Sequence, residues 1–99
     1  MKSPELVKAI EQHNTVTFYY DSLVRTVEPY TYGTHIDTGN EVLSAYQIGG
    51  FSKSNASPAW RLYRLDEISN LHILAGTFSP SRPGYNPNDK RMGQIYARA

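Results

Sequence analysis

The sequence contains no cysteine. A disulfide scaffold and a zinc site built from thiolates are therefore excluded, and a reducing compartment is expected. The chain also lacks any apolar run close to the roughly 18 residues that cross a membrane as a helix. Because no basic segment followed by an apolar one opens the chain, we expect a cytoplasmic protein with no membrane partner.

Recognisable catalytic and cofactor motifs are also missing. Lys53-Ser54 is not preceded directly by glycine, as a phosphate-binding P-loop requires. Asp66 and Glu67 are adjacent, so on a strand their carboxylates would point to opposite faces and make a poor acid–base pair. The three histidines have no metal-ligand spacing. We therefore expect neither an enzyme nor a bound cofactor or metal.

Charge of one sign is scarce, since the 99 residues carry a net charge of +1. Residues 1–75 hold six Lys and Arg against eight Asp and Glu, whereas residues 76–99 hold four against one. The basic character therefore lies in the C-terminal tail. It is too weak for a general electrostatic DNA binder, which would show a dense basic patch.

The first residues predict one short helix followed by strands. Ser3-Pro4-Glu5 supplies a hydroxyl cap, a first-turn proline and a first-turn acid, and apolar residues follow at helical spacing. Alternating β-branched and aromatic residues then predict strands. Pro29 requires an edge position or a bulge within its strand. The expected strands cover residues 15–20, 25–35, 42–48, 60–65 and 68–74.

This order of elements favours a mainly β fold, a small five-stranded SH3-like or Sm-like barrel over residues 1–75 with an N-terminal helix. The glycine- and serine-rich residues 49–59 are expected to form a flexible loop. Residues 76–99 form a basic tail rich in proline, glycine and asparagine. A cap-like Asn86 followed by proline predicts a short helix over residues 88–97, which must dock on the barrel or on a partner.

The segment "WRLYRLDEI", residues 60–68, carries two arginines that need an explanation. Arginine is seldom carried deep in a strand unless it is paired or used for binding. Strand alternation places Arg64 on one face with Trp60, and Arg61 on the other with Tyr63. We expect Arg64 to be the deeper residue and Arg61 to lie at the rim of a site.

Four blocks of the chain together resemble the WYL domain family in order and spacing. They are "LVKAIEQHNTVTFYY", "RTVEP", "VLSAYQ" and "WRLYRLDEISNLHIL", and the resemblance covers about residues 5–75. The triplet that names the family, Trp-Tyr-Leu, is matched here by Glu41-Val42-Leu43, so its leucine alone is kept. Arg25, which precedes a Val-x-Pro sequence, also fits the family pattern.

The resemblance implies an Sm/SH3-like barrel that acts as a regulatory ligand sensor. WYL domains usually follow a helix-turn-helix in bacterial transcription regulators, and their proposed ligands are nucleic acids or nucleotide-like molecules. Only one short helix precedes the barrel here. The resemblance therefore implies a stand-alone accessory module, of bacterial or phage origin, rather than a reader of DNA sequence.

The residues themselves indicate where a ligand would bind. A small barrel would bring Arg25, Arg61 and Arg64 near one another, and a guanidinium fork suits phosphate. Tyr46 and Tyr63 could stack a base or donate to a phosphate. We therefore expect a nucleotide or a single-stranded nucleic acid to bind through these five residues.

Structural interpretations of the same residues stay open. Arg64 would then pair with Asp66 or Glu28, and the tyrosines would be core or rim packing. In that case the protein is a protein–protein interaction module or a homo-oligomer, which docks through the outer face of residues 41–48 and the tail. A small enzyme with an unrecognised site is the third alternative.

Overall fold

The computed structural model describes residues 3–50 and 59–99. Most of the loop expected over residues 49–59 lies outside the described residues. The elements follow in the order α1 (Pro4–Glu11), β1 (Asn14–Tyr20), β2 (Leu23–His35), β3 (Glu41–Gly50), β4 (Ala59–Arg64), the short 3-10 helix η1 (Leu65–Glu67), β5 (Ser69–Thr77) and β6 (Met92–Arg98). The expected mainly β architecture with an N-terminal helix is confirmed.

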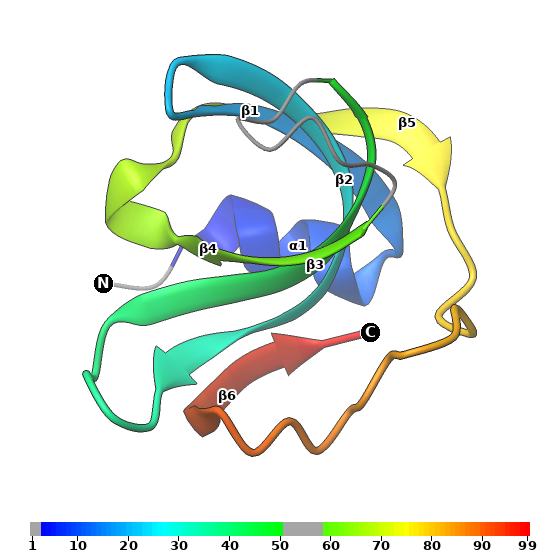
Figure 1. Cartoon of the computed structure of the whole chain (residues 1–99). Coiled ribbons are helices and arrows are strands. Elements are labelled where there is room, and N and C mark those ends of the chain that lie inside the picture. The colour runs from blue at the N-terminus through cyan, green and yellow to red at the C-terminus, as the bar shows by residue number, and fades with distance from the viewer. Residues whose placement is uncertain (1–2, 51–58) are drawn as a thin grey trace.

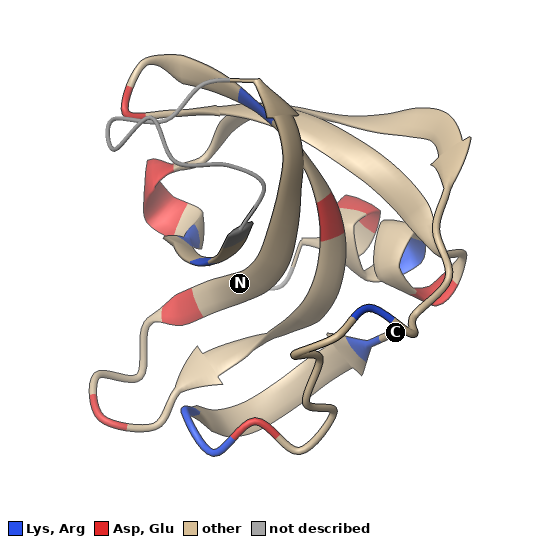
Figure 2. Cartoon of the chain, turned by 45° about the vertical axis from the view of Figure 1, so that its right-hand side comes forward, with Lys and Arg blue, Asp and Glu red and all other residues tan. Residues whose placement is uncertain are grey.

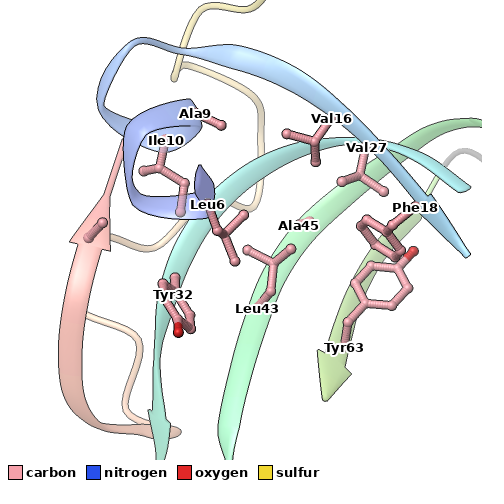
Figure 3. Packing of buried hydrophobic residues seen from close by; sticks show 11 residues of the cluster. Leu6, Ala9, Ile10, Val16, Phe18, Val27, Tyr32, Leu43, Ala45 and Tyr63 are labelled. Atoms are coloured by element: carbon pink, nitrogen blue, oxygen red, sulfur yellow. The ribbon is translucent and has the colours of Figure 1, made fainter. Parts of the chain in front are cut away.

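Helix α1 begins as its sequence predicts. The side chain of Ser3 accepts a hydrogen bond of 3.3 Å from the backbone N–H of Leu6, and Pro4 occupies the first helical position. A helix of two turns cannot stand alone in water, so packing must stabilise it. It buries Leu6, Ala9 and Ile10 against the curved sheet, as Figure 3 shows.

One antiparallel sheet curls around this core in the strand order β4-β3-β2-β1-β5, with β6 paired to β2 (Figure 1). Within residues 3–50 and 59–99, β4 and β5 do not pair. The sheet is therefore barrel-like but not closed, whereas the sequence predicted a closed barrel. Near β4 the backbone N–H of Arg64 donates to the hydroxyl of Tyr20 at 3.2 Å. A side chain rather than a backbone ladder therefore connects the ends of β4 and β1.

The prediction of a short C-terminal helix over residues 88–97 is wrong, because most of this segment forms strand β6. The C-terminal half of β2 has no β1 partner, since their pairing ends at Val27, and β6 fills the free edge from Thr31 to His35. Gly33 permits the approach, because a Cβ there would lie 2.0 Å from the carbonyl oxygen of Gln94. A free sheet edge thus decided between strand and helix, and the tail docks on its own chain.

Pro29 lies at an irregularity, as its missing N–H requires. The register between β2 and β3 shifts between Pro29 and Thr31, at the point where β2 exchanges β1 for β6 as its neighbour. The core cluster lies between α1 and the concave face of the sheet (Figure 3). Its fully buried members are Leu6, Ala9, Ile10, Val16, Phe18, Val27, Tyr32, Leu43 and Ala45, with Tyr63 1% and Ala97 7% exposed.

Candidate functional site

Arg25 is a buried cation at one end of the concave face, with 3% of its surface exposed. One terminal nitrogen, Nη2, donates to the carbonyl of Tyr20 at 3.2 Å and lies 3.7 Å from a carboxylate oxygen of Asp21. The guanidinium carbon lies 5.5 Å and 5.9 Å from the ring centres of Tyr20 and Tyr63. Its Nε has no hydrogen-bond partner among the described residues. A buried guanidinium therefore keeps one donor unused.

Gln47 organises the residues beside this arginine. Its side-chain oxygen accepts from Nε of Arg61 at 2.8 Å and from the hydroxyl of Tyr63 at 3.3 Å. Its amide nitrogen donates to the carbonyl of Gly49 at 3.0 Å, and the whole residue is buried. Three strands thus bring two guanidinium groups, an amide and a phenol to one end of the concave face.

Tyr63 remains a neutral hydrogen-bond donor over a wide pH range. Burial raises the pKa of its phenol, while the positive charge of Arg25 opposes that shift. The Tyr63 ring packs edge-on against Phe18 and Tyr20, with centroid distances of 5.0 Å and 4.9 Å. With 1% of its surface exposed, Tyr63 offers no ring face to a ligand, and its hydroxyl is engaged with Gln47.

Arg64 lies apart from this cluster, so the expectation that it is the deeper arginine is wrong. Its side chain is 49% exposed and forms an ion pair of 2.7 Å with Asp66. The structural alternative, pairing with Asp66, is the arrangement that the structure contains. Arg61 is the half-buried one of the two, on the same face as Tyr63, as alternation predicts.

Tyr46 lies on the opposite face of the sheet. It pairs with Trp60 across β3 and β4, with ring centroids 5.4 Å apart. The guanidinium carbon of Arg82, from the tail, lies 3.9 Å from the centre of the Tyr46 ring. Of the five expected site residues, Arg25, Arg61 and Tyr63 therefore share the concave face, whereas the others lie elsewhere.

Sequence reasoning missed the amide of Gln47 and the tail arginine. A polar residue that alternates with Leu43 and Ala45 on the buried side of a strand was a signal for Gln47. No local pattern marks Arg82, whose fork meets the carboxylate of Glu28 at 2.8 Å and 3.1 Å. That contact joins positions 54 residues apart, so tertiary structure alone reveals it.

Charged residues are otherwise dispersed. In Figure 2 the acidic and basic positions of the described chain alternate over several strands and turns, without a continuous basic stripe. Residues 3–50 and 59–99 contain no group of three or more metal-ligating side chains that could hold an ion. They also contain no helix long and apolar enough to cross a membrane.

Comparison with known proteins identifies the fold but not a family. No protein-family model matches the sequence, and no curated protein matches it. Among solved structures, one chain of proteasome accessory factor B/C (PafBC) of Arthrobacter aurescens is similar, with a TM-score of 0.65 and 24% sequence identity. The match covers 83% of this chain and 13% of that chain. The protein therefore has the fold of a small part of PafBC.

Proposed function

We propose that this protein is a non-enzymatic, WYL-like regulatory module that senses a nucleotide or a single-stranded nucleic acid through a phosphate group. The phosphate binds at the end of the concave face through Arg25 and Arg61. Tyr63 and Gln47 orient the two guanidinium groups. The WYL-like sequence blocks and the fold shared with part of PafBC support a sensor role.

The observation that carries the proposal is the unused donor of Arg25. Removing a guanidinium from water is costly unless every donor finds an acceptor, and arginine is almost never fully buried without pairing. Asp21 lies 3.7 Å away and is itself 35% exposed, so it offsets the buried charge weakly. Nε is buried, so the guanidinium must turn outward before a phosphate oxygen can reach it; that contact would complete the set of acceptors and lower this cost.

The remaining groups suit an anion better than a base. Arg61 Nε is held by Gln47, which fixes the direction of its guanidinium plane. Guanidinium forks bind phosphate with two parallel hydrogen bonds. Because the ring of Tyr63 is enclosed by the core, base stacking on it is excluded and its hydroxyl takes the role of a neutral donor.

Calorimetric titration with inorganic phosphate, adenosine monophosphate and a short single-stranded oligonucleotide tests the proposal. We expect binding of the two nucleic-acid ligands, lost in Arg25→Gln and retained in Arg64→Gln. Arg64→Gln is the matched control, since it removes an exposed arginine that already pairs with Asp66. Because one phosphate is neutralised at this site, the logarithm of oligonucleotide affinity should fall with the logarithm of salt concentration with a slope of about −0.7. Equal affinities of the two variants would refute the assignment.

A second candidate function, homo-oligomerisation, is favoured by exposed apolar residues. Ile48 is 43% exposed on β3. Tyr19 on β1 is 46% exposed and Ile73 on β5 is 38% exposed, and these two strands pair with each other. Strand β5 also has a free edge within the described chain. Light scattering across a concentration series separates the candidates, because Ile73→Lys would dissociate an oligomer and leave phosphate binding unchanged.

A further inference from the structure

A pocket of about 300 Å³ lies between the sheet and the tail segment that leads into β6. On the sheet side it is lined by Thr31 and Ser44, which pair across β2 and β3 and are 1% and 6% exposed. Strand alternation places Ser44 on the same face as Tyr46, opposite the face of Arg25. The pocket is therefore separate from the phosphate site.

The hydroxyl of Ser44 is a buried polar group that faces this pocket. Among residues 3–50 and 59–99, no hydrogen bond engages it. A buried hydroxyl without a partner is costly, so its partner must come from within the pocket. Because a hydroxyl can both donate and accept, it suits a ligand group with the same double capacity.

Two aromatic rings line the pocket, and both have already used their polar atoms. Trp60 Nε1 donates to the carbonyl of Pro83 at 2.9 Å, and the hydroxyl of Tyr85 donates to the carbonyl of Ala99 at 2.7 Å. The two ring planes are inclined by 17°, with their centroids 6.4 Å apart. The rings therefore offer apolar surface to a ligand and no further hydrogen bond from their N–H and O–H groups.

The charged groups of the pocket neutralise each other. Arg91 donates from Nη2 to the carboxylate of Asp89 at 2.6 Å, and this hydrogen bonding holds the pKa of Asp89 below its usual range. On the same side, Oδ1 of Asn86 accepts from the backbone N–H of Asn88 at 3.0 Å, which leaves the amide N–H groups of Asn86 for a ligand. The lining therefore carries no net charge and presents a neutral donor.

We propose that this pocket binds one uncharged sugar ring, a hexose in its pyranose form. A pyranose has an apolar C–H face for the aromatic rings and hydroxyl groups around its rim. Each of these hydroxyls can exchange a hydrogen bond with Ser44 or accept one from the Asn86 amide. The volume lies at the lower end of the roughly 300–1,000 Å³ of small-molecule pockets, so the pocket holds a single ring.

Other ligand classes match these groups less well. An anion or a cation would meet Asp89 and Arg91 already paired with each other, and so would find no free opposite charge. An apolar ligand would leave the hydroxyl of Ser44 buried without a partner. A neutral ring with hydroxyl groups satisfies both conditions.

NMR titration of the isotope-labelled full chain tests the ligand class, with the indole N–H signal of Trp60, the one tryptophan in the chain, as the readout. The probes are glucose, galactose and mannose. We expect at least one of them to shift the signal saturably, with a Kd of about 1 mM, as so small a neutral ligand allows. Sorbitol, an open-chain polyol without a ring face, should bind at least about tenfold more weakly, because binding also costs it torsional freedom.

Three results of this titration would overturn the proposal. The first is that no hexose produces a saturable shift. The second is that sorbitol binds as well as the hexoses, because the ring is then irrelevant. The third is tighter binding of uridine, which would assign the pocket to a nucleobase.

Three variants test the location of the site. Ser44→Ala removes the hydroxyl, and Asn86→Asp replaces the amide donor by an acceptor while keeping Oδ1 for Asn88. Each should weaken hexose binding at least about fivefold, the loss expected for one neutral hydrogen bond. Ser69→Ala is the matched control, since this serine is exposed on β5 and lies outside the pocket, and its Kd should equal that of the wild type.

Equal Kd values for Asn86→Asp and Ser69→Ala would show that the hexose binds elsewhere and would overturn the site. Should Ser44→Ala unfold, Asn86→Asp decides the question, because Asn86 is exposed and its substitution preserves the turn contact.

Discussion

Arg82 and Glu28 form a two-point ion pair although they lie 54 positions apart. The guanidinium of Arg82 lies over the ring of Tyr46, and the side chain of Glu28 is only 10% exposed. This pair fastens the tail segment 82–85 to the sheet. It therefore connects the basic tail to the body of the fold.

Arg82→Ala should lower the free energy of unfolding by about 1 kcal/mol, because it removes a bidentate pair and leaves Glu28 with fewer donors. Urea denaturation measures the change. Arg64→Ala is the matched control, since it removes a more exposed arginine from its pair with Asp66 and should change stability by less than about 0.5 kcal/mol. Equal effects of the two substitutions would contradict a structural role for Arg82.

Arg25→Met should stabilise the protein in the absence of ligand. Burial of a guanidinium with an unused donor is costly, and an apolar side chain of similar length fits between the rings of Tyr20 and Tyr63. Replacing a poorly compensated buried charge is expected to add about 1 kcal/mol to the free energy of unfolding. Thermal and urea denaturation measure it. A marked loss of stability would show that Arg25 is a structural residue.

Gly33→Ala should detach strand β6. The added Cβ would meet the carbonyl oxygen of Gln94, which is backbone and cannot move without breaking the β2–β6 pairing. We expect a loss of about 2–4 kcal/mol or faster amide exchange confined to β6. Gly49→Ala is the control on β3, because its Cβ would make an ordinary contact of 3.6 Å with Thr26. Unchanged exchange in β6 would contradict the close approach.

High pH should destabilise the fold through buried tyrosines. Burial, followed by the hydrogen bond to Glu28, raises the pKa of Tyr30 to about 12 from 10.0. The unfolded chain therefore loses this proton before the folded protein does. The stability that the neutral Tyr30 phenol contributes to the fold is fully present below pH 10. As pH rises from 10 to 12 this stability is lost, by up to about 1.4 kcal/mol of unfolding free energy per pH unit.

Absorbance titration of the phenolate resolves this effect. Tyr30→Phe should remove a late-ionising component from the titration curve. A late phase of the titration curve that is unchanged in Tyr30→Phe would contradict the burial of the Tyr30 phenol as the cause.

Local sequence patterns predicted most of the body of the fold. The Ser3 cap, the alternating apolar residues and the irregularity at Pro29 depend on neighbours in the chain, and each lies where the pattern indicates. The resemblance to WYL domains directed attention to Arg25, which is the buried cation of the candidate site. These features need no knowledge of distant contacts.

The sequence by itself determined which residues share a face of each strand, because side chains alternate with a period of two. It placed Arg61 on the same face as Tyr63, and Arg64 on the same face as Trp60. The tertiary structure alone decided which of these faces meets the core, since both carry apolar and polar residues. It also decided that the tail forms β6 and that Arg82 meets Glu28, because the free edge of β2 and the carboxylate of Glu28 lie far from the tail in the sequence.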